Sequence, residues 1–303
     1  MLLLTCQRLL TLARLRMLPL VLLLVLVGYG VAHWEAAVFA RRLDALALVL
    51  LAWSLLHAGT MWLNASLDRD VGDVLFGDAV EVPGGTSRVA GLALSSSVAV
   101  AALVGPGVGA AALLSAALSA AYSHPRLAWK GHPVGGPTVN ALGYGLLSPM
   151  AGWLVAGVAP TARTVALALI LVLSTLGIYF LAQLGQGEED GARGYGTLVA
   201  RHGDRSVVRE AHRTLRAAMG LFVGLAALGM LPRTLLVTAP LLVVLDRRLA
   251  GLRRADEVPA LLSALVGVAT LCVALAVGHY FADLWRVGPV AGQAVPWVPP
   301  PLW

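Results

Sequence analysis

A stripe of chemically capable residues marks the end of the second long apolar segment. His57, Met61, Asn64 and Asp68 follow one another at intervals of four, three and four residues, which places them on one face of a helix. The oxygens of Asn64 and Asp68, with Asp73 just beyond, are the hard ligands that Mg2+ takes in proteins. The spacing predicts a metal site here, although the polar exit of a membrane helix would have a similar composition.

A second acidic segment follows a later apolar run. Gln183, Gln186 and Asp190 are spaced three and four residues apart, which predicts a shared helical face, and Arg193 comes next. Gln186 and Asp190 are the expected metal ligands, because amide and carboxylate oxygens both ligate Mg2+. If the two segments meet in the fold, they would hold one or more cations between them.

A basic loop lies between the two acidic segments. It contains Tyr122, Ser123, Arg126 and Lys130, the only lysine of the chain. Two cations beside hydroxyl groups suit a phosphate or diphosphate. Basic residues are also common in membrane-protein loops, so an ordinary flanking loop is the alternative.

These segments must be positioned by membrane helices. The chain has 303 residues, of which 58% are apolar and only 13% are charged, with a mean hydropathy of +0.81, which excludes a soluble globular protein. We therefore predict an all-α, polytopic membrane helical bundle with about nine transmembrane helices, since a helix satisfies its own backbone polar groups in lipid. The expected spans are residues 17–34, 43–67, 87–107, 108–123, 139–159, 162–184, 217–232, 233–245 and 258–282.

The distribution of positive charge predicts the orientation. With nine spans and a cytoplasmic N-terminus, the cytoplasmic loops hold all of the 22 lysine and arginine residues except Arg41, Arg42, Arg163, Arg233 and Arg286. We expect a multi-pass protein of the inner (plasma) membrane whose basic loops face anionic membrane lipid, with no nucleic-acid partner. The N-terminal run also resembles a cleavable secretory signal, but we expect it to be retained as the first helix.

Three ordered motifs resemble the UbiA superfamily of intramembrane prenyltransferases. They are Asn64-x3-Asp68, Tyr122-Ser123-x-Pro125-Arg126-Leu127 and Asp190-x3-Gly194-x2-Thr197-Leu198. The resemblance implies a cytoplasmic N-terminal segment (1–16), a UbiA-like transmembrane domain (17–285) and a Pro/Trp-rich tail (286–303). It also implies Mg2+, an isoprenoid diphosphate donor and catalytic roles for Asp68 and Asp190.

The chain departs from the usual family pattern at four positions. Ala65 and Gly72 stand where the first motif commonly has aspartate, and Gln183 and Gln186 stand at acidic positions of the second motif. An amide carries no negative charge, so the second motif should hold metal less tightly than a motif with several aspartates.

The resemblance also implies a reaction and assigns roles in it. The expected function is Mg-dependent transfer of a prenyl group to a lipophilic acceptor within the membrane, with an aromatic quinone precursor as the first class to consider. Mg2+ and basic side chains would stabilise the departing diphosphate. The substrate-binding residues would be Asn64, Tyr122, Ser123, Arg126, Lys130 and Arg193, and the metal ligands Asn64, Asp68, Asp73, Gln186 and Asp190. A terpene cyclase or lyase on the same scaffold, or a non-enzymatic membrane binder with a degenerate metal site, is the alternative.

Overall fold

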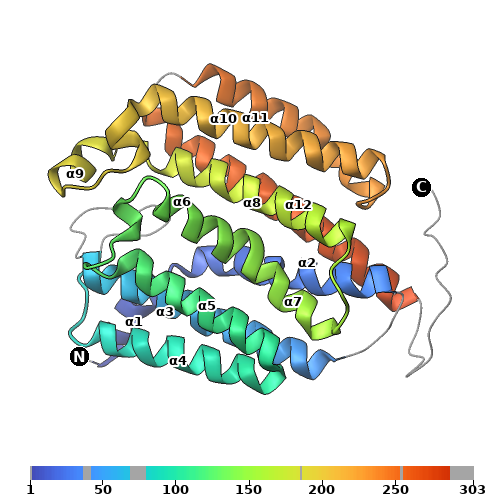
Figure 1. Ribbon diagram of the computed structural model, residues 1–303, viewed down its shortest axis with the longest axis horizontal. Helices are drawn as coiled ribbons and strands as arrows, with labels where there is room; N and C mark the ends of the chain where they lie inside the picture. The colour runs from blue at the N-terminus through green and yellow to red at the C-terminus, as the bar shows by residue number, and fades with distance from the viewer. Residues whose placement is uncertain (1, 37–41, 69–79, 185, 253–254, 287–303) are drawn as a thin grey trace.

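The computed structural model describes residues 2–36, 42–68, 80–184, 186–252 and 255–286. Every regular element among these residues is a helix (Figure 1). The long helices are α2 (Leu18–Ala36), α3 (Leu43–Asp68), α4 (Thr86–Val104), α5 (Pro106–Ser123), α8 (Ala162–Ala182), α10 (Leu198–Ala227), α11 (Ala239–Gly251) and α12 (Val258–Arg286). The shorter ones are α1 (Leu2–Leu12), η1 (Leu15–Met17), η2 (Trp129–Gly131), α6 (Gly135–Asn140), the π-helix η3 (Ala141–Leu147), α7 (Ser148–Ala156), α9 (Gly187–Ala192), η4 (Arg233–Thr238) and η5 (Ala255–Glu257). The predicted all-α membrane bundle is confirmed.

Seven helical stretches in the described part of the chain are long and apolar enough to cross a membrane. They are Leu15–Ala32, Leu43–Asp68, Thr86–Val104, Pro106–Ser123, Gly135–Ala156, Ala162–Ala182 and Val258–Ala282. The other two predicted spans, 217–232 and 233–245, fall on the second half of α10, the turn after it, η4 and α11. The first half of α10 is basic and α11 has only 13 residues, so neither qualifies by length and composition. The count of nine stays a prediction.

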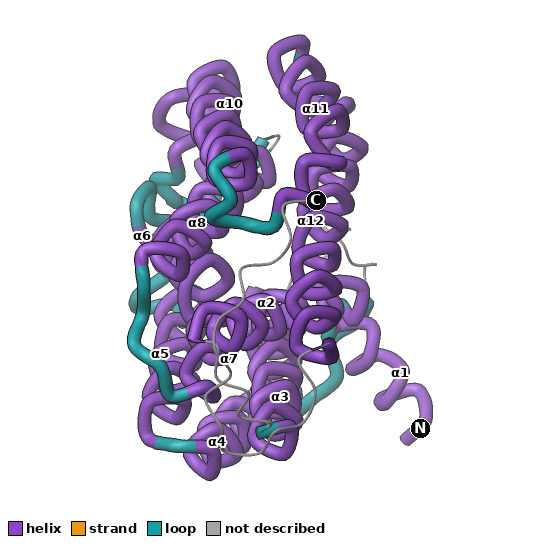
Figure 2. The backbone as a smooth tube through the Cα atoms, turned by 90° about the vertical axis from the view of Figure 1, so that its right-hand side faces the viewer, coloured by secondary structure: helices purple, strands orange, loops and turns teal. Residues whose placement is uncertain are grey.

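The helices pack into two groups joined by α2. One apolar core gathers residues from α2, α3, α4, α5 and α7, and a second gathers α2, α7, α8, α10 and α12. Figure 2 looks along the bundle, with α3, α4 and α5 on one side of α2 and α8, α10, α11 and α12 on the other. The approach of α2 to α7 requires a glycine, because a Cβ at Gly152 would lie 1.9 Å from the Val25 carbonyl oxygen.

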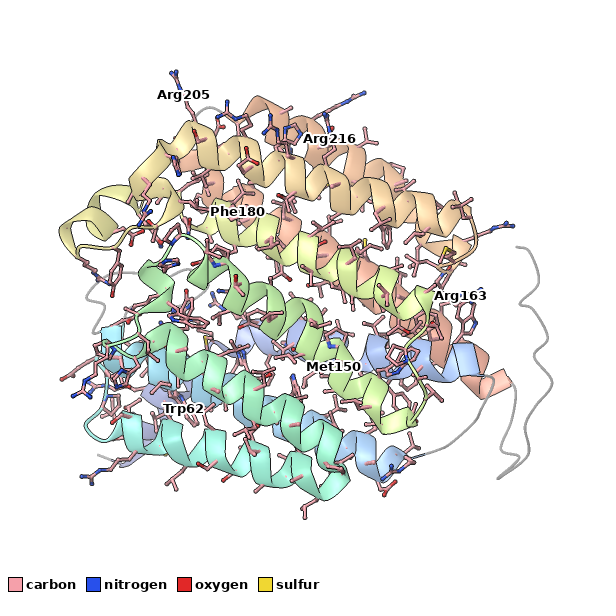
Figure 3. All side chains as sticks on the ribbon, viewed as in Figure 1. Trp62, Met150, Arg163, Phe180, Arg205 and Arg216 are labelled. Atoms are coloured by element: carbon pink, nitrogen blue, oxygen red, sulfur yellow. The ribbon has the colours of Figure 1, made fainter. Side chains whose placement is uncertain are left out.

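The basic segment after residue 197 and the predicted span that begins at residue 217 are not separate elements. Both belong to α10, which has a kink at Gly203, where the φ/ψ angles are not helical. Arg205 projects from α10 away from the bundle (Figure 3). Arg216 donates two hydrogen bonds of 2.9 and 2.7 Å to Asp246, which ties α10 to α11.

Candidate functional site

A cavity of about 510 Å3 opens between the two groups of helices. Its wall is polar toward one end, where α3 ends and where the segments after α5 and α8 begin. Charged residues there include Asp68, Lys130, Asp190 and Arg193, whereas Leu24, Leu171 and Val273 line its apolar part. The three predicted motifs therefore meet at one end of the bundle, the end that carries α9 (Figure 1).

The α3 stripe faces this cavity. His57, Met61, Asn64 and Asp68 all line it, as the helical spacing predicts. The Ser123 hydroxyl, at the end of α5, donates a hydrogen bond of 3.2 Å to the side-chain oxygen of Asn64. Asp73, the remaining predicted ligand of this motif, lies outside the described residues.

Lys130 forms an ion pair with Asp68. Only 12% of the lysine side chain and 9% of the aspartate side chain are exposed. Burial lowers the pKa of Lys130 to about 8, the nearby Arg193 guanidinium acts in the same direction, and the Asp190 carboxylate opposes both. Lys130 thus interacts with a carboxylate of each acidic motif.

Backbone contacts join the loop that carries Lys130 to the second acidic segment. The Gly196 N–H donates a hydrogen bond of 2.9 Å to the Gly131 carbonyl. A Cβ at Gly131 would lie 2.5 Å from the Tyr195 ring, so this close approach requires glycine. The Lys130 ammonium also lies 5.7 Å from the centre of the Tyr195 ring, within the range of a cation–π contact.

The second acidic motif reaches the cavity without being a continuous helix. Gln183 caps the end of α8, Gln186 precedes the short helix α9, and Asp190 lies within α9, yet all three line the cavity. The predicted shared helical face therefore holds for Gln186 and Asp190, whose main chains are joined by a helical hydrogen bond of 2.8 Å, but is wrong for Gln183, because α8 ends at Ala182 and α9 begins only at Gly187. Thr197, the N-cap of α10, donates a hydrogen bond of 2.7 Å to the Asp190 carboxylate and so holds it in place.

Two predicted binding residues behave differently from each other. Arg193 lines the cavity. Arg126 is exposed and is not part of the cavity wall, because α5 ends at Ser123 and the turn that follows directs the chain outward. In that turn the Arg126 N–H donates a hydrogen bond of 3.2 Å to the His124 ring. The structure therefore does not bring Arg126 to the site.

Sequence reasoning missed a set of hydrogen-bonded side chains in the middle of the cavity. The Tyr122 hydroxyl is hydrogen-bonded to Tyr179 of α8 and to Asn140 of α6. Tyr179 is also hydrogen-bonded to the side chain of Gln183, which is 4% exposed. The three partners of this set come from three helices, so no local spacing in the sequence could have joined them.

Comparisons with known proteins identify the family of the chain and folds similar to its own. The model of the UbiA prenyltransferase family matches residues 16–264, and no curated protein matches. The fold is similar to that of a UbiA homolog from Archaeoglobus fulgidus solved with DMAPP and Mg2+ (TM-score 0.64, 19% identity, covering 91% of this chain and 99% of that one). It is also similar to the apo UbiA homolog from Aeropyrum pernix K1 (TM-score 0.63, 17% identity, covering 84% and 97%).

A third similar structure is that of digeranylgeranylglyceryl phosphate synthase (TM-score 0.62, 15% identity, covering 90% of this chain and 98% of that one). Identities this low establish a shared fold only. The family model, however, spans most of the sequence, and the apolar helices are those of a multi-pass membrane protein. The chain belongs to the UbiA prenyltransferase family.

Proposed function

We propose that the protein transfers a prenyl group from an isoprenoid diphosphate to a lipophilic acceptor within the membrane. The observation that carries this proposal is that Asp68 and Asp190, from distant parts of the chain, line one cavity with Lys130 between them. The same cavity continues into an apolar part. A charged end beside an apolar chamber suits a ligand that has a diphosphate head and a hydrocarbon tail.

The donor groups at the charged end fit Mg2+. Asn64, Asp68, Gln186 and Asp190 offer carboxylate and amide oxygens to one cavity. When bound, Mg2+ would neutralise negative charge on the diphosphate and so make it a better leaving group. The UbiA homolog structures that contain Mg2+ together with DMAPP or GPP support this proposal.

The protein's own cations would bind the diphosphate. Lys130 and Arg193 are close enough for each to influence the other's charge, and both line the cavity. A diphosphate oxygen would compete with Asp68 for the Lys130 ammonium. Lys130 would therefore pair with Asp68 when the site is empty and with the diphosphate when the donor is bound. As the carbon–oxygen bond breaks, these cations stabilise the negative charge that develops on the leaving group.

The walls of the cavity would protect the allylic cation that remains. Tyr122, Tyr144 and Tyr179 line the middle of the cavity, and aromatic faces attract cations. The apolar residues beyond them exclude water, which would otherwise capture the cation before the acceptor does. The acceptor would approach from the lipid, and we place the charged end on the cytoplasmic side of the plasma membrane, as the arginine distribution favours.

A direct assay tests this function. Purified protein in nanodiscs is given geranyl diphosphate with MgCl2, with and without a membrane lipid extract, and released diphosphate and new lipids are measured. Prenyl transfer requires that diphosphate release depend on both Mg2+ and the extract. A cyclic hydrocarbon formed without any extract would replace the proposal with a terpene cyclase. Binding of the donor without any diphosphate release would replace it with a non-enzymatic binder.

A further inference from the structure

His57 is a buried imidazole that the site described so far does not use. It lies on α3 and is 5% exposed, and it lines the cavity. Its polar contacts among the described residues are with the main chain of Ala13 and Arg14, and neither ring nitrogen is hydrogen-bonded to a described side chain. Buried polar groups in folded proteins nearly always have their hydrogen-bonding capacity filled, so an imidazole in a cavity wall with an unfilled ring nitrogen suggests a partner that arrives with a ligand.

The position of His57 identifies which ligand it would meet. His57 precedes Asn64 by two turns on the same face of α3, which places it about 10 Å further along the helix axis, away from the charged end. The diphosphate would bind at the level of Asn64 and Asp68. A group held near His57 would therefore lie on the apolar side of the diphosphate, at the level of the donor's first carbons, where an acceptor can reach the reactive carbon.

The protein groups around His57 leave one ring nitrogen, the hydrogen-bond acceptor, without a donor. Its polar neighbours are the main chain of Ala13 and Arg14 and the charge of Arg14. A neutral imidazole has one N–H and one lone pair. Carbonyl oxygens beside the ring can only accept, so they can face the N–H but supply no proton to the lone pair. The Thr60 hydroxyl, one turn along α3, is shared with Ser119 at 2.8 Å.

Resting on the proposed prenyl transfer, we propose that the lone pair of His57 binds the hydroxyl group of the acceptor and takes its proton. The carbon–oxygen bond of the donor breaks, and its electron pair leaves with the diphosphate. The acceptor oxygen forms the new bond to the allylic carbon, and its proton passes to the imidazole. The imidazolium then returns the proton to water after the product leaves. The acceptor is thus a lipophilic alcohol or phenol.

Two matched probes test this proposal, namely 4-octylphenol and its methyl ether, 4-octylanisole, which has no hydroxyl proton. Wild-type protein should be stabilised against heat by the phenol more than by the ether, and with geranyl diphosphate it should prenylate only the phenol. His57→Leu should lose the preference in binding and should transfer the prenyl group at least 100-fold more slowly. Its thermal midpoint should stay close to that of the wild type, because the loss of the main-chain contacts with Ala13 and Arg14 is offset by removal of a buried ring nitrogen that no protein group satisfies.

Two further variants keep the test decisive. His57→Gln retains a hydrogen-bond acceptor that is a poor base, so it should still prefer the phenol in binding yet fail to transfer. Ser97→Ala removes a buried, unpaired polar group, one that lies outside the cavity wall, and should leave transfer unchanged. Normal transfer by His57→Gln, or a large drop in thermal midpoint for both His57 variants, would overturn the proposal. An absence of diphosphate release from the wild type would instead count against prenyl transfer itself, and the binding comparison would still test His57.

Discussion

Lys130 and Asp68 form an ion pair in which both side chains are almost fully buried. The lysine comes from the loop after α5 and the aspartate from the last residue of α3, so the pair fastens two of the three motifs together. A buried pair balances a large desolvation cost against its mutual attraction, and removal of one partner leaves an uncompensated charge. Removal of either partner alone should therefore destabilise the fold, whatever the pair itself contributes, and should also impair the proposed binding of diphosphate.

We expect Asp68→Ala to abolish diphosphate release and also to lower the free energy of unfolding by about 3 kcal/mol, because the Lys130 ammonium would remain buried alone. Asp190→Ala should abolish release with a smaller effect on stability, since its carboxylate is held by a single Thr197 hydrogen bond. The double variant Asp68→Asn/Lys130→Met should recover much of the lost stability and none of the activity. Thermal unfolding in detergent and a diphosphate assay measure the two effects separately, and equal destabilisation by the single and double variants would disprove the coupling.

The pH dependence of the reaction should show the loss of the proton from Lys130. Its pKa is lowered from 10.5 to about 8, chiefly by burial, so the ammonium loses its proton as the pH rises through about 8 and diphosphate binding weakens. Activity should therefore fall on the alkaline side with a midpoint near pH 8. Lys130→Arg should shift this midpoint upward, since arginine stays protonated.

The Lys130 titration that lowers activity as the pH rises should raise the stability of the fold. Between pH 8 and 10.5 the unfolded chain keeps a proton on Lys130 that the folded protein has released, so this residue's contribution to the free energy of unfolding rises with pH. An alkaline midpoint that is the same in wild type and in Lys130→Arg would show that another group titrates.

Gln186 should determine how tightly the second motif holds metal. It lines the cavity three residues after Gln183, the C-cap of α8, and its carbonyl accepts a hydrogen bond of 2.8 Å from the Asp190 N–H. A carboxylate adds a negative charge that an amide lacks, so Gln186→Asp should lower the Mg2+ concentration needed for half-maximal rate and change the maximal rate little. Identical Mg2+ titrations for wild type and variant would remove Gln186 from the metal site.

The native cysteines can report the orientation of the protein. Cys6 on α1 is exposed and Cys272 on α12 is buried. The Trp62 indole of α3 donates a hydrogen bond of 2.8 Å to the Leu9 carbonyl of α1, which places α1 beside the end of α3 that carries Asn64 and Asp68. A membrane-impermeant maleimide should label Cys6 in inverted vesicles and not in right-side-out vesicles. Cys6→Ser serves as the control, and the reverse pattern would place the charged end of the cavity outside the cell.

The sequence predicts those parts of the site that depend on one regular helix. Asn64 and Asp68 share a face because both belong to α3, and apolar length alone identifies seven helices. The Gln183, Gln186 and Asp190 set could not be predicted in the same way, since the chain leaves α8 and turns before α9 begins. The exposure of Arg126 likewise depends on the turn that follows the end of α5 at Ser123. The Tyr122, Asn140 and Tyr179 contact depends on how three helices pack, which no local pattern encodes.

The π-helix at Ala141–Leu147 has a consequence for how relatives of this protein should be aligned. A π-turn accommodates one residue more than an α-turn, and such turns are common at functional sites. Deletion of one residue from this stretch would restore an α-helix and rotate α6 by about 100° relative to α7. Asn140 would then swing away from Tyr122, while Ser148 would keep its hydrogen bond of 3.1 Å from the Trp53 indole. A relative that lacks this residue would present a different set of side chains from α6 to the same cavity, while α7 and its contact with Trp53 would stay in place.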